Sequence, residues 1–346
     1  MSTGAENSSG VMREAVHIIP EFTFECGETL KEMKVGYVTH GALNQRKDNA
    51  VLVTHGTSAN RHTFDVYIGP GRAFDTDRYF VIAVDAIGGG TSSSPKDGLG
   101  IDFPRYSIRD MVKAQHDLVV KGLNLPGILA TGGSSMGAFQ ALEWGIAFPD
   151  FMKGLLLIVP AAKAPNSIKA VIDTMIAVVK LDPKWNAGRY TENPTAGLSA
   201  AGMVFGAWFL SDLYLESRTT PAAYEEALMV MARAYVNWDA VSWMWRYLAS
   251  REHDASKPFG GDMKIALGRV RAKTLVMPSA TDRVLPLFGA HELRDGIAGA
   301  IYAEIDSVMG HMAQNPCDAD TSEHRFVDAK IANFLRTLQA GVNTPS

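Results

Sequence analysis

Short apolar runs rich in β-branched and aliphatic residues recur along this chain, separated by amphipathic stretches and by Gly and Pro. This alternation is typical of a mostly parallel sheet, because strands that helices cover on both faces carry apolar side chains throughout. We therefore predict an α/β fold with a mostly parallel central sheet flanked by helices. The predicted strands are residues 33–39, 50–55, 79–85, 127–131, 154–159, 273–278 and 301–305, and the predicted helices include 107–122, 136–148 and 324–338.

Residues 162–265 break this alternation, since about a hundred residues offer helical patterns and no convincing strand. We predict that residues 1–161 and 266–346 form the core and that 162–265 form a helical cap, or lid, inserted into it. The segment is rich in Met, Trp, Tyr and Phe. Most of these side chains are expected to pack inside the cap, and a minority to line a pocket.

Charge and composition exclude several classes of protein. A formal net charge of -4 argues against a general binder of nucleic acid, which needs a basic surplus. The first 14 residues lack the apolar run of a signal peptide, and no apolar stretch reaches the roughly 20 residues that span a bilayer. With only two cysteines, Cys26 and Cys317, the simplest location is the cytoplasm. We expect no membrane partner.

A glycine-rich segment, Gly88-Gly89-Gly90-Thr91, is the only motif that suggests a nucleotide, and it lacks the Lys of a P-loop and the spacing of a dinucleotide fingerprint. It is better interpreted as a loop at the mouth of a pocket. No His-Glu-x-x-His motif and no cysteine pair indicates a metal. We therefore predict neither a cofactor nor a metal site.

A candidate nucleophile lies in Gly133-Ser134-Ser135-Met136-Gly137, between an apolar strand and a helix. A Gly-x-Ser-x-Gly match is weak alone, and it could be a serine-rich turn that closes a strand. In this context it resembles the nucleophile turn of the α/β-hydrolases, where a strained backbone holds the serine hydroxyl clear of the sheet. We predict Ser135 as the nucleophile.

Two backbone N–H groups are predicted to bind the oxyanion that forms when Ser135 attacks an acyl group. Met136 would supply one, at the start of the following helix. Thr57 would supply the other, because it follows the strand 50–55 in the loop His55-Gly56-Thr57. His55 is interpreted as a structural residue of that loop, since the catalytic base is expected late in the chain.

The acid and the base occur in the chain order Ser, Asp, His that this fold requires. Asp282 follows the strand 273–278 and His311 follows the strand 301–305, so both lie just past the carboxyl end of a strand. His311 would take the proton of Ser135 and later return it, while Asp282 would orient the imidazole. Ser135, Asp282 and His311 are thus the predicted catalytic triad.

Ordered motifs extend over nearly the whole chain, among them Gly41-Ala42-Leu43-Asn44, Phe74-Asp75-Thr76-Asp77-Arg78, Gln140-Ala141-Leu142-Glu143-Trp144 and Asp182-Pro183-Lys184-Trp185-Asn186. With these motifs the sequence resembles the homoserine O-acetyltransferases and the hydrolases and esterases related to them. The resemblance implies an α/β-hydrolase fold, acyl transfer through an acyl-serine intermediate, and a homodimer that associates through its caps.

Two departures from the acetyltransferases concern the acceptor. Members of that family carry an Asp directly after the catalytic His, where this chain has Met312, and a Gln-Arg pair in the first cap helix, where it has Met175 and Ile176. Apolar side chains cannot replace an Arg–carboxylate clamp and an ammonium partner. Homoserine is therefore disfavoured as the acceptor.

Three functions remain open after these steps. The first is a serine hydrolase that cleaves a small carboxylic ester as its small-molecule partner. The second is an acyl-CoA-dependent O-acyltransferase, homoserine O-acetyltransferase-like, acting on an uncharged alcohol. The third is a catalytically silent ligand-binding protein on the same scaffold, which the fold alone does not exclude.

Overall fold

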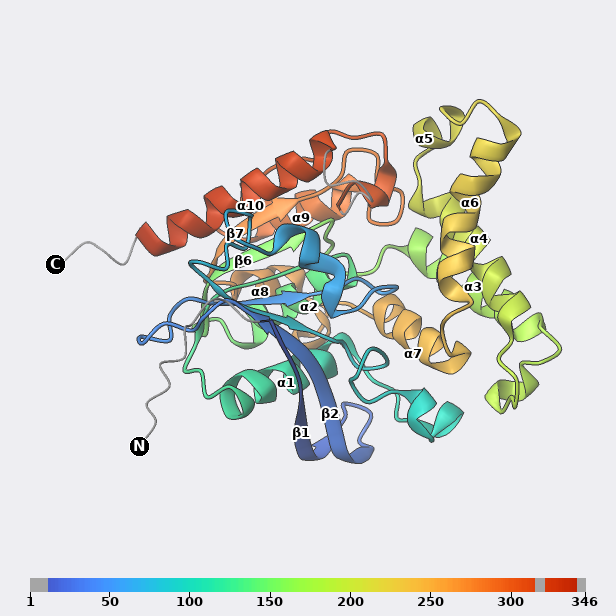
Figure 1. The fold of residues 1–346 in the computed structure, drawn as a ribbon, viewed down its shortest axis with the longest axis horizontal. Coiled ribbons are helices and arrows are strands. Elements are labelled where there is room, and N and C mark those ends of the chain that lie inside the picture. The colour runs from blue at the N-terminus through green and yellow to red at the C-terminus, as the bar shows by residue number, and fades with distance from the viewer. Residues whose placement is uncertain (1–11, 315–320, 341–346) are drawn as a thin grey trace, which may run out of the picture.

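The computed structural model describes residues 12–314 and 321–340, and one eight-stranded sheet lies at its centre (Figure 1). The strand order is β1-β2-β4-β3-β5-β6-β7-β8. β1 pairs antiparallel with β2, and β2 antiparallel with β4; every other pair is parallel, which confirms the predicted sheet. The strands are β1 (Arg13–Thr23), β2 (Thr29–His40), β3 (Ala50–Thr54), β4 (Phe80–Val84), β5 (Ile128–Ser134), β6 (Met152–Ile158), β7 (Lys273–Met277) and β8 (Ile301–Tyr302).

The described helices are α1 (Ile108–Asp117), α2 (Met136–Ala147), α3 (Asn166–Leu181), α4 (Thr195–Phe209), α5 (Asp212–Glu216), α6 (Pro221–Tyr235), α7 (Ala240–Arg251), α8 (Met263–Gly268), α9 (Leu287–Gly296) and α10 (Ser322–Ala340). Helices α1, α2, α8 and α9 cover one face of the sheet, and α10 covers the other. None of the described helices is long and apolar enough to cross a bilayer.

The central strands send alternate side chains into two separate hydrophobic cores. Leu52, Ile82 and Leu155 pack in one core with α1, α2, α8 and α9, whereas their neighbours in sequence pack in the other core with α10. Alternation is the geometry of a strand, and burial on both faces explains why the strands are apolar throughout. α2 is buried along nearly its whole length, so it also carries almost no polar side chains.

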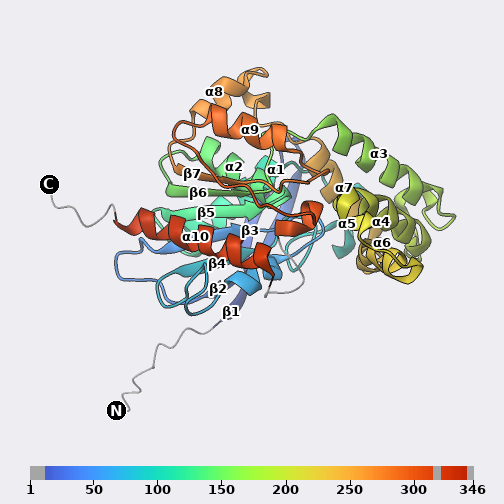
Figure 2. The same ribbon diagram turned by 90° about the horizontal axis from the view of Figure 1, so that it is seen from above.

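The helices α3 to α7 lie together at one end of the sheet in both views (Figures 1 and 2). Within residues 166–268 the described chain forms helices and loops and no strand. The predicted cap boundary at residue 265 falls inside α8, which lies beside α9 in Figure 2.

The parallel strands β3, β5, β6 and β7 end at a common edge, because Thr54 is opposite Gly133, Ser134 opposite Ile158, and Ile158 opposite Met277. The loops that follow β3, β5 and β7 carry Thr57, Ser135 and Asp282. The carboxyl edge of a parallel sheet is where such folds bind ligands. The α3–α7 helices cover this edge.

Candidate active site

Ser135 joins β5 to α2 with a φ of 58° and a ψ of -121°, a conformation that residues with a side chain rarely adopt. The two flanking glycines permit the tight crossing of strand and helix. A Cβ on Gly137 would lie 2.1 Å from the carbonyl oxygen of Thr54, and one on Gly133 would lie 2.3 Å from the carbonyl oxygen of Gly137. Both positions must therefore be glycine.

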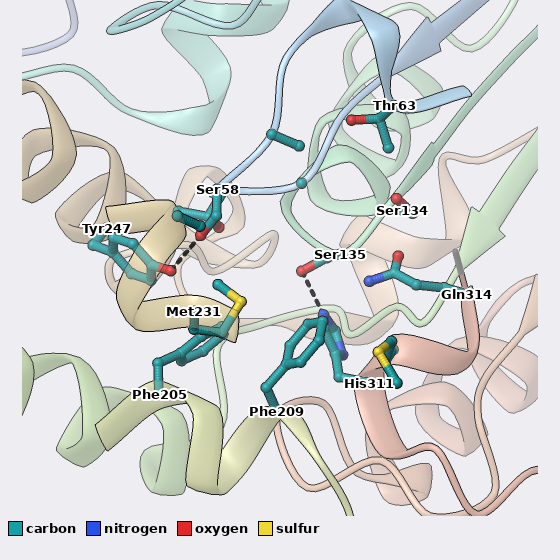
Figure 3. A pocket seen from close by; sticks show the side chains of 15 residues that line it. Ser58, Thr63, Ser134, Ser135, Phe205, Phe209, Met231, Tyr247, His311 and Gln314 are labelled. Carbon is teal, nitrogen blue, oxygen red and sulfur yellow. Dashed lines mark hydrogen bonds between the residues drawn. The ribbon is translucent and has the colours of Figure 1, made fainter. Parts of the chain in front are cut away.

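The three predicted triad side chains meet at the carboxyl edge of the sheet. His311 Nε2 lies 2.9 Å from Ser135 Oγ (Figure 3), and His311 Nδ1 lies 2.6 Å from Asp282 Oδ2. Since Asp282 can only accept, the Nδ1 proton is donated to it and Nε2 is left free to accept the Ser135 hydroxyl proton. This arrangement can activate a serine for attack.

Further hydrogen bonds hold the acid and the base in place. Oδ1 of Asp282 accepts from the backbone N–H groups of Val284 at 2.8 Å and Leu285 at 3.0 Å, so both carboxylate oxygens are used. His311 lies in a short 3₁₀ helix, η7 (Gly310–Gln314). The carbonyl of Gly310 accepts from Ser279 Oγ at 2.7 Å, which ties η7 to the end of β7.

The loop after β3 passes directly beside Ser135. A Cβ on Gly56 would lie 3.5 Å from the Cβ of Ser135 and 3.9 Å from its Oγ. Thr57 is the next residue, and Met136 is the first residue of α2, where backbone N–H groups have no partner within the helix. The fold thus brings both predicted oxyanion donors next to Ser135.

His55 is buried away from the serine. Its Nδ1 lies 2.8 Å from the carbonyl oxygen of Gly56, and its Nε2 accepts from the backbone N–H of Ala86 at 3.0 Å. Burial, with the positive charge of Arg246, lowers the pKa of His55 to about 4. A neutral imidazole that bridges two loops agrees with the structural role expected for it.

Two cavities flank Ser135. The larger, about 210 Å³, lies between the loop after β3, η7 and the helices α4, α6 and α7 (Figure 3). The smaller, about 30 Å³, has room for about two water-sized groups and is lined mainly by apolar side chains, among them Phe139, Ile168 and Ile172. The cap contributes to the larger cavity Phe205, Phe209, Met231, Ala234 and Tyr247.

The described residues that line these cavities include no Asp, Glu, Lys or Arg. Met312, which stands where the resemblance implies an Asp in the acetyltransferases, lines the larger cavity. Met175 and Ile176 are buried on α3 and line neither cavity. A zwitterionic amino acid would therefore find no charged partner among these residues.

Several lining residues had no signal in the sequence. Ser58 and Tyr247 lie 2.7 Å apart, oxygen to oxygen, in the wall of the larger cavity. Ser250 of α7 bonds to Thr57, with 3.1 Å between the hydroxyl oxygens. Ser58 lies in the turn after β3 and the other two lie on α7, and no motif in the sequence marks any of the three. Within residues 12–314 and 321–340, no three His, Cys, Asp or Glu side chains gather as a metal site requires.

Comparison with known proteins defines the class. The family described as alpha/beta hydrolase fold matches residues 49–314, so the chain is an enzyme of the α/β-hydrolase superfamily. A homoserine O-acetyltransferase of Leptospira biflexa is 31% identical over 372 aligned residues, covering 96% of each chain. The chain accordingly belongs to the homoserine O-acetyltransferase-like family of this superfamily.

Among solved structures, the acetyl esterase MekB superposes with a TM-score of 0.89 at 28% identity, covering 94% of this chain and 97% of the esterase. An acetylester hydrolase from Corynebacterium glutamicum gives a TM-score of 0.87 at 26% identity, covering 94% and 96%. The chain is thus similar over nearly its whole length both to acetyltransferases and to acetyl esterases.

Proposed function

We propose that this protein is a carboxylic-ester hydrolase that cleaves small acyl esters through an acyl-enzyme on Ser135. The observation that carries the proposal is the uncharged lining around the Ser135–His311 pair. It suits a neutral ester and offers nothing to an amino-acid acceptor. The acetyl esterases among the structural relatives support the same reaction.

In this mechanism His311 removes the Ser135 proton as Oγ attacks the ester carbonyl carbon. The backbone N–H groups of Thr57 and Met136 stabilise the oxyanion of the tetrahedral intermediate, and Asp282 stabilises the imidazolium. His311 then protonates the leaving alcohol. Water, activated by the same imidazole, attacks the acyl-enzyme and releases the acid with Ser135 restored.

The two cavities provide room for the two halves of such an ester. The smaller cavity touches Ser135 and fits an acyl group of about acetyl size. The larger cavity touches Ser135 and His311 and would hold the alcohol part against Phe205, Phe209 and Met231. The substrate class is therefore a short-chain ester of an uncharged, partly apolar alcohol.

The second candidate is acyl transfer from acyl-CoA to an uncharged alcohol. The 31% identity to a homoserine O-acetyltransferase favours it, because the same triad serves transfer and hydrolysis. Incubation with acetyl-CoA and homoserine should give no acetylhomoserine, and clear product would contradict the argument from Met312 and Ile176. Acyl transfer to an added alcohol much faster than ester hydrolysis would favour the transferase.

Hydrolysis of p-nitrophenyl acetate tests the proposal. Ser135→Ala should lower the rate by about a thousandfold or more, since removing the nucleophile disables the triad as a unit. Ser256→Ala is a suitable control, because it removes a buried hydroxyl that is bonded to Asp254 and lines neither cavity. Equal rates in the Ser135→Ala variant and the wild type would reject the triad and favour a ligand-binding protein.

A further inference from the structure

Arg246 of α7 is a buried cation that holds the loop after β3. Arg246 is only 1% exposed. Its Nη1 donates to the carbonyl oxygen of Thr57 at 3.0 Å and to that of Ala59 at 2.8 Å. These carbonyls stand on either side of Ser58. One nitrogen therefore fixes two peptide groups of the segment that begins with the proposed oxyanion donor.

The glycine-rich segment 88–91 packs against the guanidinium of Arg246. A Cβ on Gly89 would lie 1.9 Å from Arg246 Nη2, and one on Gly88 would lie 2.0 Å from the hydroxyl of Tyr106. The ring of Trp238 covers the guanidinium, with 4.5 Å between Cζ and the ring centroid. Gly89 thus makes room for the guanidinium of Arg246, and Gly88 makes room for the hydroxyl of Tyr106.

Packing alone does not explain a charge at this place. No Asp or Glu in the described ranges forms an ion pair with Arg246, and burial lowers the pKa of its guanidinium. An unpaired buried cation is costly, and an apolar side chain of similar length would fill the same volume. What the guanidinium provides and an apolar side chain could not is the pair of hydrogen bonds to the carbonyls of Thr57 and Ala59.

Two more residues of α7 reach the same loop. Ser250, one helical turn after Arg246, bonds through its hydroxyl to Thr57 Oγ1 at 3.1 Å. Tyr247 bonds to Ser58 Oγ at 2.7 Å. Each residue of the segment 57–59 is therefore held by α7, a helix of the predicted cap, while Ser135 comes from the sheet.

We propose that Arg246 is a positioning residue that orients the Thr57 N–H toward the oxyanion, so that α7 completes the catalytic machinery. The inference rests on the proposed acyl-serine chemistry. An oxyanion donor acts only at about 2.7–3.1 Å from the developing charge, so a small shift of the loop removes most of its effect. Substrate binding depends far less on that geometry.

The test compares Arg246→Met, Arg246→Lys and wild type for Ser135-dependent hydrolysis of p-nitrophenyl acetate and for inhibition by a trifluoromethyl ketone, which forms a tetrahedral adduct. Arg246→Met should lower kcat about ten- to a hundredfold and leave KM within about threefold of the wild-type value. Inhibition by the ketone should weaken by a factor similar to the loss in kcat. Arg246→Lys should restore part of both, because an ammonium can still donate to the two carbonyls.

Trp245→Phe is the matched control. It removes a buried hydrogen bond from the same helix, Trp245 Nε1 to the Phe103 carbonyl at 2.9 Å, and does not touch the segment 57–59. It should lower the melting temperature and leave kcat unchanged. If Arg246→Met does not fold, Arg246→Lys and Ser250→Ala test the positioning role instead. In each of these two variants kcat should fall while KM stays nearly unchanged.

Two failures are distinguishable. A wild-type protein whose Ser135 is acylated by neither p-nitrophenyl acetate nor acetyl-CoA would refute the proposed function, and with it the inference. A wild-type protein that is acylated at Ser135, together with an Arg246→Met variant of equal kcat or altered only in KM, would overturn the inference and leave the proposed function standing.

Discussion

Glu143 of α2 is a carboxyl group buried to 1% exposure without a hydrogen bond to its Oε1 among the described residues. Arg109 Nη1 and His253 Nδ1 lie 3.6 and 3.7 Å from that oxygen, too far to bond to it. Burial raises the pKa of Glu143 to about 8, against an ordinary value of 4.5. Between these pH values the unfolded chain releases the proton and the folded chain retains it, so stability falls as pH rises.

Glu143→Gln should therefore stabilise the protein above about pH 4.5, with a gain in melting temperature that grows to a few degrees by pH 8. At pH 4 the two proteins should melt alike, because glutamine imitates the neutral acid. Thermal unfolding followed by circular dichroism from pH 4 to 8 measures this.

Glu25→Gln is the control of opposite sign. Glu25 Oε1 accepts from Arg109 Nε at 2.6 Å, and the pKa of Glu25 lies below its ordinary value. Glu25→Gln should lower the stability of the folded protein at neutral pH, and this loss should become smaller as the pH falls. A gain for Glu143→Gln that does not change with pH would show that its proton plays no part.

At the residue scale, chain order and strand context were enough to predict which side chains meet. Ser135, Asp282 and His311 each follow a strand, and parallel strands must end at one edge, so the fold itself brings them together. Arg246 could not be predicted in this way. Its hydrogen-bond partners are backbone carbonyls, which leave no pattern in the sequence. The space for its guanidinium is left by Gly89, more than 150 residues earlier in the chain.

At the element scale, the parallel strands were predictable because burial on both faces makes them apolar. β1 was missed, since most of its residues are exposed and Pro20 interrupts it; antiparallel pairing with β2 at the edge of the sheet defines it instead. α9 was missed as well, because few of its residues are buried. β8 is shorter than predicted: its strand ends at Tyr302, and a single bridge joins Ile305 to Ser279.

The first cap helix sets the size of the small cavity, and this predicts acyl-chain selectivity. Ile172→Ala on α3 should lengthen the accepted acyl group, because the lost carbons line the cavity beside Ser135. We expect the ratio of p-nitrophenyl butyrate to acetate hydrolysis, measured as kcat/KM, to rise about tenfold. Ile176→Ala removes the same atoms one turn along α3, outside both cavities, and should leave the ratio unchanged. An equal rise of the ratio in both variants would contradict this assignment, because it would reflect a general loosening of α3 rather than the lining of the small cavity.

At the scale of the whole molecule, the helices α3 to α7 lie over one end of the sheet (Figures 1 and 2), the carboxyl edge to which the predicted triad maps. Their buried residues, such as Val171, Phe205 and Trp243, belong to the same hydrophobic core as α1 and α2. The predicted cap segment is thus packed against the rest of the protein as a wall of the candidate active site. The homodimer that the family resemblance implies stays a prediction.

The proposed function requires Ser135 to carry the acyl group during turnover. Mixing the protein with p-nitrophenyl acetate, quenching in acid within a fraction of a second, and mapping the peptides by mass spectrometry tests it most directly. A good leaving group allows the acyl-enzyme to accumulate. We expect an acetyl group on Ser135 that disappears at longer times in water and is absent from the Ser135→Ala and His311→Ala variants. Turnover of the ester with no acetyl group on Ser135, or with the acetyl group on another residue, would contradict it.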